Sequence, residues 1–111
     1  MDNVEDDKYY FKKAVEEIEI IERYVADKTY SEFMADEKLI DAVMFRLVQL
    51  IENIKKISQS FKNSHPSIEW GNIVGFRNGI VHHYGKTDYS IVYEVASHDL
   101  SELKEVFIQN M

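Results

Sequence analysis

The sequence predicts an all-α protein, an antiparallel helical bundle of four main helices plus a short extra helix. Only one Pro and four Gly occur in 111 residues, whereas charged residues make up 30% and apolar residues 45%. Apolar residues also recur at three- and four-residue spacing along most of the chain, as on the inner faces of packed helices. A chain of this length holds one core, so we expect residues 1–111 to form a single domain.

The first half of the chain predicts two helical regions. One apolar stripe runs through about residues 6–26. After a polar break, in which Thr29 or Ser31 could cap the next helix, a longer helical region is expected over about residues 31–62, bent near residues 35–36. The core face of this second region is predicted to comprise Ile40, Val43, Leu47, Leu50, Ile51, Ile54 and Ile57.

The second half predicts three further helices. Pro66 fits the first turn of a helix over about residues 67–84, because a proline there leaves no N–H unpaired. Gly85 is expected to end this helix in the left-handed conformation. Asp88 could cap a short fourth helix, and a last helix is expected over about residues 99–109.

The composition excludes several classes of protein. The absence of Cys rules out disulfides and thiolate metal sites, and the scattered His residues predict neither a metal site nor a cofactor. No apolar run approaches the roughly 20 residues of a membrane span, and the acidic N-terminus differs from a signal peptide, so we expect a cytoplasmic protein without membrane association. A net charge of −7 argues against binding long nucleic acid over the whole surface, but it allows a local basic cleft and suits a basic partner.

Residues 77–84, Arg-Asn-Gly-Ile-Val-His-His-Tyr, are the most informative segment. An Arg and a His held close together can bind a phosphate and move a proton, which metal-free RNA cleavage requires. Arg77 and His82 are five residues apart, about 140° around a helix axis, so one ideal helix does not bring them together. Either the helix ends near His82, or a second copy contributes its own pair across a two-fold axis, and we therefore expect a homodimer. From the residues alone, surface or structural roles for both side chains remain an alternative.

Three glycines share one face of the same predicted helix. Gly71, Gly75 and Gly79 are four residues apart, and each costs about 1 kcal/mol relative to Ala in a helix interior. Close approach of another backbone is the simplest explanation, with ligand access or a helix crossing at a dimer interface as alternatives. Tyr84 lies almost on the face of Arg77, where a structural contact between guanidinium and ring is the alternative to a functional role.

The segment around this octapeptide resembles the signature of the HEPN superfamily, specifically its HepT-like branch. That branch is marked by R-x4-H-x-Y, which Arg77, His82 and Tyr84 match, and the Asn typical of the position after the Arg is Asn78. The resemblance covers about residues 66–107. It implies a HEPN-like helical fold.

The resemblance further implies a toxin of a type VII-like toxin–antitoxin pair, acting on RNA as a homodimeric, metal-independent endoribonuclease. Its partner would be an antitoxin, a nucleotidyltransferase of the MNT type, that adenylylates Tyr84. Chemically, His82 would be the general base for the 2′-OH, Arg77 would bind the phosphate, and Asn78 could position either group. DNA would be spared because it has no 2′-OH.

One departure from the family pattern keeps a second reading open. Members often carry a basic residue two positions after the Arg, where this chain has Gly79. Its absence removes a phosphate contact and, with the acidic net charge, favours a non-catalytic nucleotide- or partner-binding module of the same two-gene system. A purely structural helical dimer would explain the glycines but not the motif.

Overall fold

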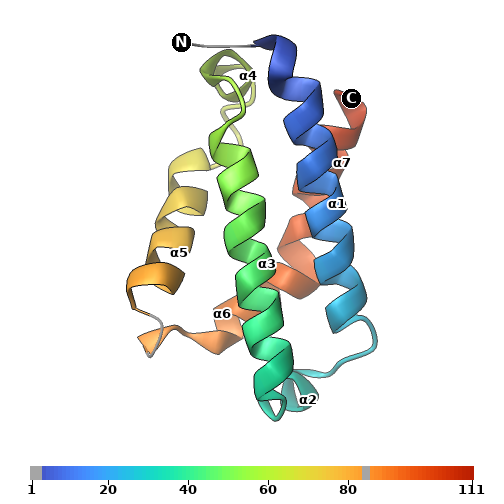
Figure 1. Ribbon diagram of the computed structural model, residues 1–111, viewed down its shortest axis with the longest axis vertical. Coiled ribbons are helices and arrows are strands. Elements are labelled where there is room, and N and C mark those ends of the chain that lie inside the picture. Colours follow the sequence, from blue (N-terminus) through green and yellow to red (C-terminus); the bar gives the residue numbers. More distant parts are fainter. Residues whose placement is uncertain (1–3, 84–85) are drawn as a thin grey trace.

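The computed structural model describes residues 4–83 and 86–111, and the described chain is all-α, as predicted (Figure 1). Four longer helices dominate, and neighbouring ones run antiparallel (Figure 1). These are α1 (Asp7–Val25), α3 (Glu37–Lys55), α5 (Trp70–His82) and α7 (Leu100–Gln109). The shorter elements are a 3₁₀ turn (Val4–Asp6), α2 (Tyr30–Met34), α4 (Gln59–Asn63), α6 (Tyr89–Glu94) and a π-helix (Val95–Asp99).

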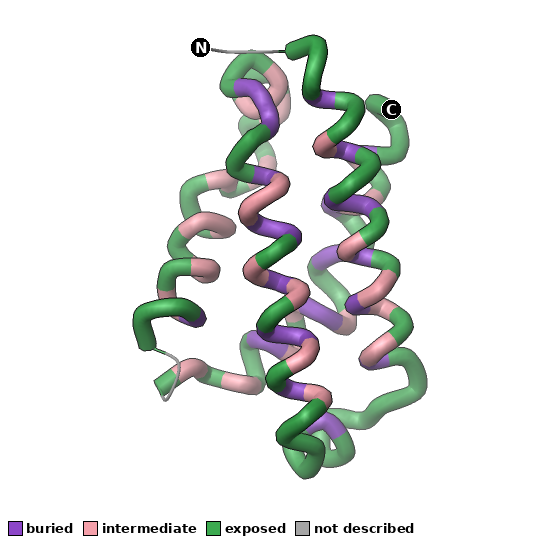
Figure 2. Tube along the Cα trace, in the orientation of Figure 1, coloured by how far each residue is buried: buried purple, intermediate pink, exposed green. Residues whose placement is uncertain are grey.

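The core lies between α1, α3 and α7, because their apolar stripes face one another. Figure 2 shows that buried residues concentrate on these helices, whereas α5 is mostly half-buried or exposed. Ile18 and Ile21 of α1, Leu47 of α3 and Phe107 of α7 are at most 1% exposed. All seven residues predicted for the core face of the second helical region are buried.

The predicted break near residues 35–36 is confirmed, and polar caps produce it. Thr29 and Glu32 form a capping box at α2: the Glu32 N–H donates to Thr29 Oγ1 and the Thr29 N–H to Glu32 Oε1, at 3.1 and 2.9 Å. Asp36 then caps α3 by accepting from the Leu39 N–H at 3.0 Å. Side-chain oxygens thus satisfy backbone donors that a helix start leaves free.

The prediction that this helical region continues to about residue 62 is wrong, because α3 ends at Lys55. Ser58 is buried in an extended conformation, and its backbone N–H and hydroxyl donate to the Asp7 carboxylate at 2.8 and 2.6 Å. Ser58 also caps α4 by accepting from the Phe61 N–H. A contact across 51 residues of sequence therefore ends one helix and starts the next.

The third long helix begins at Trp70, so the prediction that Pro66 occupies its first turn is wrong. The indole N–H of Trp70 lies 3.2 Å from both the Lys62 and the His65 carbonyl oxygens and holds the intervening chain in turns. The expected role of Gly85 as C-cap lies outside the described residues.

The last two helices match the prediction with one addition. Asp88 caps α6, accepting from the Ser90 N–H at 2.9 Å. The π-helix, which the sequence did not predict, joins α6 directly to α7. The Tyr93 hydroxyl donates to the Lys28 carbonyl at 2.6 Å and holds α6 against the loop after α1. None of the helices in the described part of the chain combines the length and apolar character of a membrane span.

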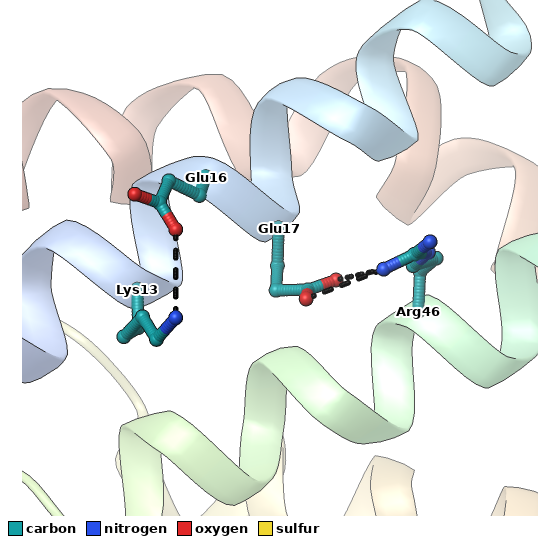
Figure 3. A network of polar contacts seen from close by, with 4 residues as sticks. All are labelled: Lys13, Glu16, Glu17 and Arg46. Carbon is teal, nitrogen blue, oxygen red and sulfur yellow. Dashed lines mark hydrogen bonds and ion pairs between the residues drawn. The ribbon is translucent and has the colours of Figure 1, made fainter.

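Ion pairs add to the apolar contacts between the long helices. Lys104 of α7 lies 2.6 Å from Glu22 of α1. Arg46 of α3 reaches Glu17 of α1 at 3.5 Å, as Figure 3 shows. Both pairs lie at the edge of the core, where partial exposure limits their contribution to about 1 kcal/mol or less.

Candidate functional site

Helix α5 carries most of the octapeptide and is the least buried of the longer helices. Among its residues only Ile80 is fully buried, while Ile73 and Phe76 pack against the core from a half-buried position. The helix lies at the edge of the bundle, beside α3 (Figure 1). Most of its circumference is therefore open to a ligand or a partner.

Arg77 lies on the side of α5 that faces α3. Its Nε is 2.8 Å from Oε1 of Glu52, and Nη1 donates to the Asn78 side-chain oxygen at 3.1 Å. The contact with Glu52 is an ion pair and not an aligned hydrogen bond. The side chain is 23% exposed, so the guanidinium is held in place but can still be reached from solvent.

His82 is the last residue of α5 and is exposed. Its ring has no hydrogen bond or ion pair within the described residues. Asn78, predicted to position either His82 or the phosphate, instead contacts the guanidinium of Arg77.

The structure does not join Arg77 and His82 within one chain. The helix does end at His82, which was one of the two conditions for bringing them together. Even so, Arg77 is turned toward α3 while His82 points to solvent, and no hydrogen bond or ion pair connects them among the described residues. A site using both therefore needs substrate to bridge them or a second copy of the chain.

A comparison with known protein families accounts for this motif. Residues 14–109 match the family model described as ribonuclease HepT-like. The chain belongs to the HepT-like family of HEPN proteins.

Individual relatives agree with this assignment. A probable ribonuclease HepT of Thermococcus cleftensis is 30% identical over 100 residues, covering 90% of this chain and 91% of the relative. A Methanocaldococcus jannaschii protein is 32% identical over 106 residues, and its name pairs gamma-glutamylcyclotransferase with a provisional RNase assignment. That match covers 96% of this chain but only 48% of the relative, so the chain spans about half the length of that protein. No solved structure was found to match the chain.

Glu52 is the residue of this HepT-like site that the sequence did not reveal. It lies on α3, and its Oε1 contacts Arg77 of α5 and also Lys55 of its own helix, the latter at 3.6 Å. In the sequence Glu52 looks like one of many solvated carboxylates, because only the packing of α5 on α3 brings it to Arg77. Its spacing to Lys55 gave a signal for a pair within the helix, but none for Arg77.

Exposed apolar side chains occur on both helices that carry the Arg77–Glu52 pair. Val81, one turn after Arg77, is 46% exposed, and Phe45, two turns before Glu52, is 59% exposed. Val74, three residues before Arg77, is half-buried.

The simplest explanation of the three glycines, close approach of another backbone, is wrong within the chain. A Cβ added at Gly71, Gly75 or Gly79 would have no heavy atom within 4 Å beyond its own stretch of helix. The described part of the chain therefore gives no packing reason for glycine at these positions. Ligand access and a crossing helix from a second copy remain as explanations.

Tyr84 lies outside the described residues, so its predicted role stays a prediction. The other described histidines outside the motif have structural partners. His65 stacks on Phe61, with ring centroids 4.2 Å apart, and His98 Nδ1 lies 3.2 Å from Glu94 Oε1. Within residues 4–83 and 86–111, no group of three or more His, Asp or Glu side chains is placed to hold a metal ion.

Proposed function

We propose that this chain is a metal-independent endoribonuclease and acts as a homodimer, with Arg77 and His82 of both copies forming the site. The observation that carries the proposal is how these two side chains are held and exposed in a HepT-like domain. One cation is fixed by Glu52 and partly exposed, and one imidazole is exposed and unpaired within the described chain. We expect the protein to act in the cytoplasm.

The reaction uses the 2′-OH of RNA as the nucleophile. His82 accepts the 2′ proton while the 2′-oxygen attacks the adjacent phosphorus, and the P–O5′ bond breaks. The departing 5′-oxygen takes a proton from a protonated His82 of the second copy. The products are a 2′,3′-cyclic phosphate and a 5′-hydroxyl, so no metal, oxidant or reductant is consumed.

Arg77 is suited to stabilise the phosphate during this step. A guanidinium has five N–H donors, and the structure commits Nε toward Glu52 and one Nη1 donor to Asn78. The remaining donors can bind two phosphate oxygens. Because Glu52 restrains the group beforehand, little reorganisation is needed when charge develops in the transition state.

The exposed surface of α5 supports the proposed dimer. Val81, one turn after Arg77 on α5, is an exposed apolar side chain, and Gly71 and Gly75 leave room for another helix to approach closely. A two-fold axis near this surface would place His82 of one copy toward Arg77 of the other.

We also infer that the chain is the toxin of a two-gene pair and that an MNT-type nucleotidyltransferase antitoxin silences it by adenylylating Tyr84. In sequence Tyr84 is two residues from His82, so an added AMP would place bulk and a negative phosphodiester beside the site. Coexpression with such an enzyme is expected to add one or more AMP units to the intact mass. No AMP should be added to Tyr84→Phe, and an unchanged wild-type mass with an active partner contradicts the modification.

The ribonuclease proposal is tested by RNA cleavage in EDTA with the wild type, His82→Ala, Arg77→Ala and the control His98→Ala. Loss of a general base is expected to slow cleavage about 10²- to 10⁴-fold, while His98→Ala, an exposed histidine paired with Glu94, should retain activity. Circular dichroism and light scattering establish that each variant is folded and dimeric. Full cleavage by folded His82→Ala would overturn the proposal.

A second function, non-catalytic binding of a nucleotide or of the partner enzyme, is favoured by Gly79 and by the net charge of −7. In that case the wild type cleaves no RNA, yet still binds the nucleotidyltransferase.

A further inference from the structure

A groove of about 340 Å³ lies between the C-terminal half of α5 and the start of α6. Most of its wall is apolar, formed by Phe76 and Ile80 from α5 and Ile91 from α6. Ile91 is 50% exposed, so the groove is open to solvent on the α6 side. A flat apolar group such as a nucleobase can pack against such a wall.

One positive group, Lys86, lies at the rim of this groove. Lys86 is exposed, and its ammonium has no ion pair within the described residues, whereas its backbone N–H donates to the His83 carbonyl at 2.8 Å. The Thr87 hydroxyl donates to the same carbonyl at 3.2 Å. These two bonds fold the chain so that Lys86 and His83 line the same groove, where a phosphate could contact both.

Gly79 contributes the bare part of the wall. It lines the groove, and no heavy atom of the described chain outside its own stretch of helix comes within 4 Å of where its Cβ would be. Any larger side chain here would project into the groove. Glycine at this position therefore keeps this part of the groove open.

Asp88 supplies a hydrogen-bond acceptor at the same groove. Hydrogen bonds from the Ser90 hydroxyl and backbone N–H lower the pKa of Asp88, so its carboxylate stays ionised at neutral pH. It can accept from a ribose hydroxyl or from the amino group of a base. The charged and titratable side chains that line the groove are thus Lys86, His83 and Asp88.

A second, larger cavity of about 470 Å³ lies between α3, α5 and the π-helix with α7, and it has the opposite character. Its charged side chains are the carboxylates of Glu69, Asp99 and Glu102, and no Lys, Arg or His lines it within the described chain. A polyanion is repelled there. Of the two cavities beside α5, only the smaller is lined by a lysine within the described chain, and that lysine can pair with a phosphate.

The smaller groove also lies next to the candidate catalytic group. His83 lines it and directly follows His82, the last residue of α5. If one phosphate of an RNA strand lies at His82, the neighbouring nucleotide can therefore lie in the groove at the C-terminal end of α5.

We propose that the groove between α5 and α6 is a subsite for one nucleotide of single-stranded RNA, with the base on Phe76, Ile80 and Ile91 and the phosphate at Lys86. This inference rests on the proposed ribonuclease function. Gly79 is then a specificity-determining position of that site, because its lack of a side chain admits the base.

Binding can be measured separately from cleavage. The probe is an adenosine tetranucleotide with 2′-O-methyl ribose, which cannot be cleaved, titrated into ¹⁵N-labelled protein and followed by amide NMR shifts. We expect shifts at Gly79, Ile80, Lys86 and Ile91. Gly79→Leu should weaken binding about tenfold, a typical effect of losing one stacked base, and Lys86→Gln a few-fold.

A matched control separates the loss of one lysine at the subsite from a general loss of charge. Lys12→Gln removes an exposed lysine of α1, a helix that does not line the groove. It should bind the probe like the wild type. A Cβ at position 79 has no heavy atom of the described chain within 4 Å beyond its own stretch of helix, and Leu is a better helix former than Gly, so Gly79→Leu should fold and, by light scattering, keep the wild-type mass.

Equal probe affinity of Gly79→Leu and wild type, or shifts confined to other surfaces, would overturn the subsite. Tighter binding of 5′-AMP than of the tetranucleotide would also overturn it, in favour of a free-nucleotide site. Cleavage of unmodified RNA by wild type and His82→Ala is read in parallel. If the wild type cleaves RNA but the probe shifts no amide signals of the groove residues, only the subsite proposal is refuted. If the probe shifts these signals but the wild type cleaves no RNA, only the ribonuclease proposal is refuted.

Discussion

Helices α1 and α3 differ from α5 in how much of each helix is buried. The first two have 19 residues each, with seven buried in each, whereas α5 has 13 residues with one buried. The burial that stabilises the fold is therefore concentrated in α1 and α3 with α7. Helix α5 contributes less to stability but carries Arg77, Asn78 and His82, three of the glycines and part of the lining of both cavities.

Two Arg–Glu pairs between helices repeat this contrast. Arg46–Glu17 joins α3 to α1 at 3.5 Å (Figure 3), and Arg77–Glu52 joins α5 to α3 at 2.8 Å. Both are partly exposed, so neither contributes much to the free energy of unfolding. The two arginines differ in role: Arg46 only joins two helices, whereas Arg77 belongs to the HepT-like motif. A variant of the Arg46 pair is therefore a control for the same change in the Arg77 pair.

The largest expected effect is the loss of stability on removing a core side chain of α3. Leu47 is 1% exposed, so Leu47→Ala should lower the free energy of unfolding by about 2–5 kcal/mol. Ile73→Ala on α5 should cost clearly less, because Ile73 is only half-buried. Urea denaturation followed by circular dichroism measures both. Equal losses in the free energy of unfolding would show that α5 is as well packed as α3 and would contradict the difference in packing between the two helices.

The part of the fold that was predictable from sequence is the part set by local rules. Apolar spacing gave α1 and the core face of α3, and the caps at Thr29 and Asp88 were visible as residues suited to start a helix. The end of α3 was not predictable, because the Asp7–Ser58 contact spans most of the N-terminal half. The late start of α5 has the same cause, since the Trp70 indole reaches back to carbonyls five and eight residues earlier.

The candidate site divides in the same way. The motif placed Arg77 and His82 on one helix, and the helix geometry already argued that one chain could not bring them together. The sequence could not show that Glu52 holds Arg77, because only tertiary packing joins α3 to α5. It also could not show that Gly79 opens a groove, because the opposite wall comes from α6. Interactions within a helix were predictable, and those between helices were not.

The second prediction separates the two ion pairs. Glu52→Gln should lower kcat for RNA cleavage about 10- to 100-fold, because Arg77 loses the charge that holds it in position. KM should stay unchanged or fall, since a carboxylate near the phosphate site is removed. The free energy of unfolding should change by less than about 1 kcal/mol.

Glu17→Gln is the control for this change. It removes the same charge from the Arg46 pair and should leave kcat and KM at wild-type values. If Glu17→Gln lowers kcat as much as Glu52→Gln does, both effects come from a general loss of negative charge. A wild-type kcat for Glu52→Gln would show that Arg77 needs no restraint from α3.

The smallest expected effect is a gain in stability from Gly71→Ala. The added Cβ has no heavy atom of the described chain within 4 Å beyond its own stretch of helix, and Ala loses less conformational entropy than Gly when a helix forms. The free energy of unfolding should therefore rise by up to about 1 kcal/mol at protein concentrations where the chain is monomeric. If a second copy packs closely on the glycine face of α5, the same methyl group should weaken the dimer, which sedimentation at increasing concentrations measures. A stabilised monomer with an unchanged dimer would place the contact elsewhere on α5, nearer the exposed Val81.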